Sequence, residues 1–170
     1  MQIVGLSNSG KTTLILDMIK LFEKQNLSVA IVKSARGHNI SSSDKDSDKF
    51  LAKGVISSTV SFSNITQITL NEKTPLFELL RNIQSLSKPD IILVEGFKNE
   101  EYDKILVWSE DLKDKIDLFN LTNLKLIYCL KSKYSDYSEE LAELEKSLST
   151  VVLYDLSDIY SYIIENRTEV

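Results

Sequence analysis

Apolar residues follow two alternating patterns along this chain, and the patterns predict strands and helices in turn. Short runs rich in β-branched residues predict strands at 1–4, 28–32, 91–94, 104–108, 124–130 and 151–154. An apolar stripe of helical period predicts a helix at about 11–25, and we expect further helices at about 75–86, 138–148 and 155–166. Because strands that alternate with helices form parallel sheets, we expect an α/β fold with a mostly parallel sheet covered by helices on both faces.

A different pattern occupies the middle of the chain. Residues 34–48 are polar and predict a functional loop, and residues 46–53 predict a short helix. The runs at 55–62 and 65–70 are rich in β-branched residues and only two residues apart, which is typical of a β-hairpin. We expect this hairpin to extend one edge of the sheet, where it offers a pairing edge for a homodimer.

Composition restricts the classes of protein that fit this pattern. The 170 residues are 42% apolar and 26% charged, which suits one globular domain over 1–170. The formal net charge of −5 argues against nucleic acid as a primary partner, and no apolar run reaches the roughly 20 residues of a membrane span. The N-terminus lacks the apolar core of a secretion signal, and the single cysteine, Cys129, has no disulfide partner within the chain. We therefore expect a cytoplasmic protein.

The clearest chemical signal lies between the first predicted strand and the first predicted helix. The phosphate-binding P-loop pattern, G-x-x-x-x-G-K-[ST], is matched by Gly5-Leu6-Ser7-Asn8-Ser9-Gly10-Lys11-Thr12. Such a loop points backbone N–H groups into one concavity, and the helix that follows directs the positive end of its dipole toward the phosphate. Lys11 would contact the β- and γ-phosphates, and the Thr12 hydroxyl would bind Mg²⁺. The predicted nucleotide-binding residues are Ser7, Asn8, Ser9, Gly10, Lys11, Thr12 and Thr13.

A P-loop also needs an acid at the end of a neighbouring strand, where it holds Mg²⁺ or its waters. Glu95 directly follows the apolar run at 91–94 and is our candidate. Asp46, in the polar loop, is a second candidate that would order a metal-bound or attacking water; the alternative is a helix cap in a solvated loop. The predicted metal site is thus Thr12, Asp46 and Glu95. The sequence does not identify a catalytic residue, and Lys11 and Asp46 are the candidates.

Other residues allow both a functional and an ordinary interpretation. Lys33 and Lys98 each follow a predicted strand, where they would face an anionic ligand or remain surface lysines. His38 is the only histidine and would either touch a ligand or be exposed in its loop. Cys129 lies in an apolar run and is expected to be a small core residue.

Three segments occur in the order and spacing of a known family. They are Ser7-Asn8-Ser9-Gly10-Lys11-Thr12-Thr13-Leu14, Lys45-Asp46-Ser47 and Leu93-Val94-Glu95-Gly96-Phe97-Lys98. Together they resemble MobB, the family of molybdopterin-guanine dinucleotide biosynthesis protein B. The resemblance continues through Lys104-Ile105-Leu106-Val107 and is weak from about residue 110.

This resemblance implies both a fold and a function. It implies a P-loop NTPase fold that binds GTP and Mg²⁺, usually as a homodimer. It also implies an adapter with slow or partner-dependent GTP hydrolysis that supports a MobA-type guanylyltransferase in molybdenum cofactor biosynthesis. Molybdopterin itself is a further candidate ligand. Asp46 matches the aspartate of the family's Gly-Lys-Asp-Ser motif, which supports its place in the site.

The chain also departs from the family pattern. Lys33-Ser34 stands where the family commonly has Lys-His, and Asp44 precedes Lys45 where the family usually has glycine. The usual guanine reader N-K-x-D is absent, which leaves Asp136, after the strand that ends at Leu130, as a candidate guanine acceptor.

Two other functions fit a P-loop. One is a small-molecule kinase or an ATP-dependent synthetase of a related class. Such enzymes often close an arginine lid over the phosphates, and here only Arg36 lies in a loop predicted near them. The other is an interaction module with a vestigial P-loop, which the intact Gly10-Lys11-Thr12 sequence disfavours.

Overall fold

The computed structural model describes residues 1–35, 46–112 and 120–167. They belong to two compact units: the first comprises residues 1–34 and 80–170, and the second comprises residues 35–79. The residues of the P-loop and Glu95 belong to the first unit, and Asp46 belongs to the second.

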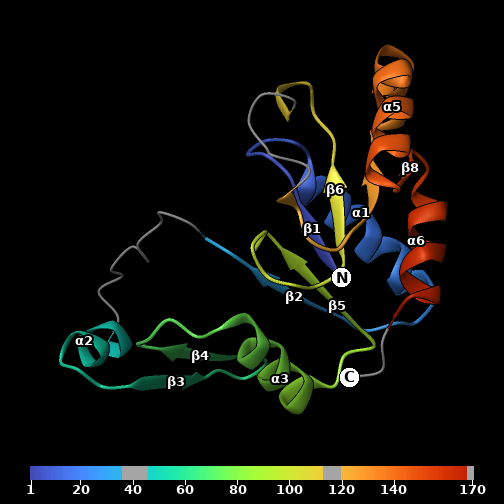
Figure 1. Ribbon diagram of the computed structural model, residues 1–170. Helices are drawn as coiled ribbons and strands as arrows, with labels where there is room; N and C mark the ends of the chain where they lie inside the picture. The colour runs from blue at the N-terminus through green and yellow to red at the C-terminus, as the bar shows by residue number, and fades with distance from the viewer. Residues whose placement is uncertain (36–45, 113–119, 168–170) are drawn as a thin grey trace. The chain divides into compact units, whose positions relative to one another are not determined.

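A six-stranded sheet forms the centre of the first unit (Figure 1). Its strands are β1 (Gln2–Val4), β2 (Val29–Lys33), β5 (Ile91–Glu95), β6 (Lys104–Val107), β7 (Leu124–Tyr128) and β8 (Val151–Leu153). They lie in the order β2-β5-β1-β6-β7-β8, and every neighbouring pair is parallel. The predicted parallel α/β fold is therefore confirmed. Because β1 lies inside the sheet, the loop that follows it opens between the ends of β5 and β6.

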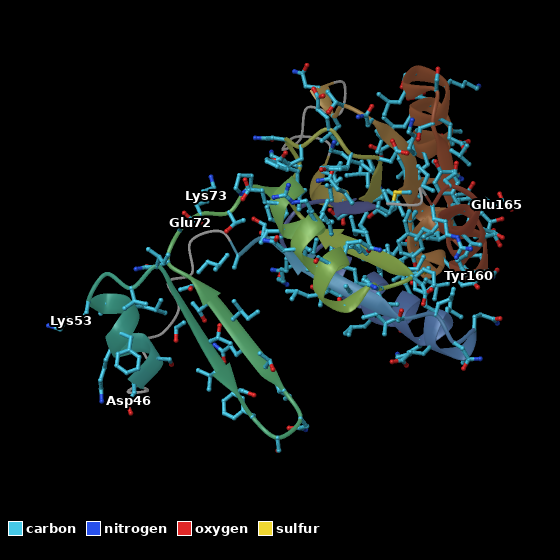
Figure 2. All side chains as sticks on the ribbon, turned by 90° about the horizontal axis from the view of Figure 1, so that it is seen from below. Asp46, Lys53, Glu72, Lys73, Tyr160 and Glu165 are labelled. Atoms are coloured by element: carbon cyan, nitrogen blue, oxygen red, sulfur yellow. The ribbon has the colours of Figure 1, made fainter. Side chains whose placement is uncertain are left out.

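Two long helices cover one face of this sheet. They are α1 (Lys11–Lys24) and α6 (Leu156–Glu165). Met18 and Phe22 of α1 and Ile159 of α6 are fully buried in one apolar cluster with Ile3 of β1. The ring of Phe22 also lies 5.4 Å from that of Tyr160, which is labelled in Figure 2. The apolar stripe of α1 thus fixes the helix that begins at the P-loop against the central strand.

The other face of the sheet packs against α5 (Ser138–Leu148). Leu141 of α5 is buried with Val4, Leu106 and Ile127 from three adjacent strands. Since successive side chains of a strand point to opposite faces, Ile3 and Val4 join different clusters. Helices therefore cover both faces, as predicted. The shorter elements nearby are η1 (Glu110–Leu112), α4 (Lys131–Tyr134) and η3 (Ser135–Tyr137). Within the described ranges, no helix is both long enough and apolar enough to cross a bilayer.

The second unit contains a short helix and a hairpin. They are α2 (Asp46–Ala52) and the antiparallel strands β3 (Ser57–Ser61) and β4 (Thr66–Leu70); α3 (Leu76–Ser87) follows and leads to β5. The predicted hairpin is confirmed, but the expectation that it extends the parallel sheet is wrong, because β3 and β4 form a two-stranded sheet of their own. Strands in a sheet covered on both faces are nearly continuous apolar runs, whereas β3 reads Ser-Ser-Thr-Val-Ser.

Candidate functional site

The loop between β1 and α1 depends on two glycines. Gly5 has a φ of +149°, and a Cβ there would lie 2.9 Å from the carbonyl oxygen of Val107 in β6 and 2.8 Å from Ser9 Oγ. Gly10 has a left-handed φ of +96° and is the N-cap of α1. A side chain at Gly5 would thus separate the loop from β6, and one at Gly10 would strain the start of the helix.

The start of α1 has the properties of an anion site. Gly10 makes no side-chain cap, so the first-turn N–H groups of this 14-residue helix point outward without a side-chain acceptor. Ser9 Oγ is buried and has no hydrogen-bond partner among the residues that the structure describes. A buried hydroxyl without a partner is costly, and a phosphate oxygen in the loop would satisfy it. These features fit a bound phosphate.

The side chain of Lys11 contacts the backbone of the loop in which a phosphate would bind. Its Nζ donates a hydrogen bond to the carbonyl oxygen of Leu6. Burial lowers the pKa of Lys11; the Glu95 carboxylate opposes this effect and Lys33 adds to it. The hydrogen bond that Lys11 donates within the described residues is thus a local backbone contact, which a phosphate would replace with a charge-assisted one.

Glu95 lies beside the P-loop at the end of β5. In the pairing of β1 with β5, Glu95 lies opposite Ile3, and Glu95 is only 9% exposed. Both of its carboxylate oxygens lie 3.3 Å from Thr12 Oγ1 and 3.0 Å from Lys33 Nζ. Thr12 and Glu95, which we predicted to share a metal site, thus lie side by side, and Lys33 joins them.

The donor set at this point suits Mg²⁺. A threonine hydroxyl and a carboxylate are hard oxygen ligands, and Mg²⁺ usually completes its shell with waters and phosphate oxygens rather than with a full protein cage. Accordingly, the described part of the chain holds no group of three or more His, Cys, Asp or Glu side chains with metal-site geometry. Thr12 and Glu95 would hold the ion or its waters beside the phosphates.

The other residues that the sequence singled out belong to other elements of the chain. Asp46 is the first residue of α2 in the second unit, where its exposed carboxylate forms an ion pair with Lys49 at 3.0 Å (Figure 2). Its part in the metal site stays a prediction. Lys98 is exposed after β5. Cys129 is buried in the core, as expected, and burial raises the pKa of its thiol. Residues Arg36, His38 and Lys45 lie outside the described residues.

Sequence reasoning missed two buried polar residues in the central strands β1 and β6. Gln2, fully buried in β1, donates from Nε2 to the carbonyl oxygen of Phe97 at 2.9 Å and so holds the turn that follows Glu95. Lys104, also fully buried, donates from Nζ to the carbonyl oxygens of Tyr102 (3.2 Å), Thr122 (2.8 Å) and Glu100. The available signal was a polar residue at or next to the start of a predicted strand.

Comparison with known proteins identifies the family. The family model described as "MobB: Molybdopterin guanine dinucleotide synthesis protein B" matches residues 1–130. The chain belongs to the MobB family. The match runs beyond residue 110, where the resemblance in the sequence fades, and it includes the P-loop, Asp46 and Glu95.

Individual MobB relatives agree with this assignment. A Bacillus subtilis (strain 168) protein named "Probable molybdopterin-guanine dinucleotide biosynthesis adapter protein" is 29% identical over 137 residues, which cover 78% of this chain and 77% of the relative. The Haemophilus influenzae (strain ATCC 51907 / DSM 11121 / KW20 / Rd) protein named "Molybdopterin-guanine dinucleotide biosynthesis adapter protein" is 30% identical over 113 residues, which cover 65% of this chain and 63% of the relative. The solved structure of Bacillus subtilis MobB aligns with a TM-score of 0.69 and 24% identity, over 99% of this chain and 97% of that one. The MobB fold therefore extends to the C-terminal part of the chain.

Proposed function

We propose that this protein is a GTP-binding adapter in molybdopterin-guanine dinucleotide biosynthesis. The observation that carries the proposal is the contact between Thr12 Oγ1 and both oxygens of Glu95 at 3.3 Å, directly after a P-loop. The name that the curated relatives share, biosynthesis adapter protein, supports the pathway. Family membership also favours this function over a small-molecule kinase or a synthetase.

Each residue of the site then has a specific role. Backbone N–H groups of residues 7–13 bind the phosphates, and Lys11 exchanges its contact with Leu6 for one with the β- and γ-phosphates. Thr12 binds Mg²⁺ directly, while Glu95 and Asp46 order its waters. When bound, Mg²⁺ neutralises phosphate charge. Guanine specificity follows from the family rather than from these residues.

Slow or partner-dependent GTP hydrolysis follows from the residues that the site lacks. Phosphoryl transfer depends on positioning and on charge stabilisation, for which many P-loop proteins use an arginine. Among the described residues, the arginines are Arg81 in α3 and Arg167 near the C-terminus, and neither belongs to the P-loop or to the ends of β1 and β5. We therefore expect a partner to complete the site, with Lys11 and Asp46 as the candidate catalytic residues within this chain.

A homodimer through the hairpin unit is part of the proposal. The hairpin is a two-stranded sheet, which is marginally stable alone in water. Large apolar side chains on and beside it are exposed; Ile56 reaches 84%, and Phe62, Ile65 and Ile68 are half exposed or more. Because such exposed clusters mark interaction surfaces, a second copy of the chain would bury them. Sedimentation at micromolar concentration tests this, and a monomer would contradict it. We also propose that residues 1–170 form one nucleotide-binding domain, in which residues 35–79 are an insertion. The protein is proposed to be cytoplasmic.

A pulldown tests the adapter function. The bait is this protein, and the target is a MobA-type guanylyltransferase, with and without GTP and Mg²⁺. We expect capture that increases with GTP in the wild-type protein but not in Lys11→Ala. Molybdopterin added to the same mixture reports whether it binds directly. Absence of capture under all conditions would contradict the adapter function, as would rapid multiple-turnover phosphoryl transfer to a small acceptor.

A further inference from the structure

We infer that the guanine base of the bound nucleotide rests on Tyr134 and Tyr154, where Lys131 and Asp155 recognise its edge. This inference rests on the proposed function, because it assumes that the phosphates bind in the P-loop. It adds the residues that determine base specificity. No motif in the sequence identifies these residues.

The order of the strands indicates the direction in which the nucleotide extends. All six strands are parallel, so β1, β6, β7 and β8 end in that order along one edge of the sheet. With neighbouring strands about 4.8 Å apart, the ends of β7 and β8 lie about 10–15 Å from the P-loop. On the opposite side of β1, the ends of β5 and β2 carry the Glu95–Lys33 ion pair, a polar surface suited to phosphate and metal. The base therefore extends toward β7 and β8.

An aromatic surface lies at the ends of those two strands. Tyr134, in α4 after β7, and Tyr154, directly after β8, have ring centroids 4.5 Å apart and planes inclined by 39°. Tyr154 is 41% exposed, and Leu130, the N-cap of α4, is 48% exposed. Exposed aromatic faces stack on any nucleobase, whatever its pattern of hydrogen-bond donors and acceptors. This surface would hold the base, and polar groups beside it would choose which base.

A donor and an acceptor lie beside the aromatic surface. Lys131 Nζ is 3.5 Å from Asp155 Oδ2, at the start of α6. The other oxygen, Oδ1, accepts from Ser157 N at 3.0 Å and from Ser157 Oγ at 2.7 Å. These hydrogen bonds from Ser157 lower the pKa of Asp155, so the carboxylate is ionised at neutral pH. Oδ2 retains acceptor capacity and faces a cationic donor.

This pair complements the edge of guanine. The O6 of guanine accepts a hydrogen bond, for which Lys131 is the donor, while N1–H and the 2-amino group donate to a carboxylate such as Asp155. The two side chains come from the ends of different strands, which explains why no contiguous N-K-x-D sequence is needed. We assign this role to Asp155 in place of Asp136, which lies in η3 and in a hollow lined by Glu139, Glu140 and Glu143.

The test is the substitution Asp155→Asn, assayed with Mg²⁺ and GTP, XTP or ATP by calorimetric titration. Asparagine caps a helix as well as aspartate, so α6 is retained. Xanthine carries a carbonyl oxygen where guanine carries the 2-amino group, and the new amide donates to it. We expect the GTP/XTP affinity ratio to fall by about 10- to 100-fold, the discrimination typical of a bidentate base contact. Asp158→Asn, a change of the same kind in the first turn of α6, is the matched control and should leave the ratio unchanged.

The outcomes separate this inference from the proposed function. An unchanged GTP/XTP ratio in Asp155→Asn, in a wild-type background that binds GTP, overturns the base site and leaves the P-loop function standing. A wild-type protein that binds no nucleotide overturns both. Tyr154→Ala adds a second readout: we expect weaker binding of GTP and XTP by a similar factor, and rescue by Tyr154→Phe. Equal affinities in wild type and Tyr154→Ala contradict the stacking role.

Discussion

The ammonium of Lys33 lies 3.0 Å from each carboxylate oxygen of Glu95, at the point where the P-loop's metal is expected. The β2–β5 register places the two residues opposite each other, and Thr12 Oγ1 is 3.3 Å from the same oxygens. The protein thus supplies its own cation to a nearly buried acid. In the proposed site, Mg²⁺ would have to compete with Lys33 for Glu95.

This competition predicts the effect of Lys33→Met. The Lys33 side chain is 54% exposed, and an ion pair of this kind contributes about 0.2–1 kcal/mol. Removing it should lower the Mg²⁺ concentration needed for half-maximal GTP binding by up to about fivefold, since 1.4 kcal/mol corresponds to a factor of ten. Fluorescent-nucleotide titration at fixed GTP and varied Mg²⁺ measures this. A higher Mg²⁺ requirement would show instead that Lys33 contacts the phosphates.

Glu95→Gln tests the role of the acid itself. Glutamine has the same shape and still accepts a hydrogen bond from Thr12, but it carries no charge to orient the waters of Mg²⁺. Loss of an outer-shell metal partner typically costs about 10- to 100-fold in metal affinity. We expect a loss of this size in GTP affinity with Mg²⁺ and little change in EDTA. Glu100→Gln, an exposed acid after β5, is the control. Equal losses in the two variants would exclude a metal-site role for Glu95.

Gly5→Ala tests the close packing of the P-loop against β6. The added methyl would lie 2.9 Å from the carbonyl oxygen of Val107, and we expect a loss of about 1–3 kcal/mol in unfolding free energy together with weaker GTP binding. Gly10 has a left-handed φ, but no atom of the described residues lies within 4 Å of the Cβ that Gly10→Ala would add. This substitution should cost about 1–2 kcal/mol from backbone strain alone. Chemical denaturation of both variants measures the difference, and a Gly5→Ala protein as stable as wild type would be incompatible with this packing.

Lys104→Met tests the buried ammonium at the start of β6. Methionine fills a similar volume but leaves the carbonyl oxygens of Tyr102 and Thr122 without their donor. We expect a loss of about 1–3 kcal/mol in unfolding free energy, the cost of leaving buried polar groups unpaired. Lys125→Met, which removes an exposed lysine 3.6 Å from Asp103, should have a much smaller effect in the same denaturation experiment. Similar losses in both would argue against a special role for Lys104.

The elements of the fold could largely be predicted from sequence because their signals are local. A continuous apolar run such as 91–94 and a helical stripe such as that of α1 each lie within one short segment. The pairing of the hairpin could not be predicted in the same way. Whether β3 and β4 join the parallel sheet or pair only with each other depends on backbone edges distant in sequence, and apolar periodicity does not encode that choice.

The same distinction applies to the site. The P-loop is contiguous, and the proximity of Thr12 to Glu95 follows from parallel strands that end at one edge. The contact between Lys33 and Glu95 depends on the exact β2–β5 register, which an exposed lysine at a strand end does not reveal. Tyr134 and Tyr154 are likewise brought together only by the neighbouring positions of β7 and β8.

A calorimetric titration of GTP and ATP with Mg²⁺, into wild type and Lys11→Ala, tests the nucleotide site most directly. In the wild type we predict tighter binding of GTP than of ATP. In Lys11→Ala we predict the loss of nucleotide binding with an unchanged unfolding transition, because the substitution removes a charge-assisted phosphate contact and no core packing. Equal or tighter binding of ATP would contradict the guanine assignment, and unchanged GTP affinity in Lys11→Ala would contradict a functional P-loop.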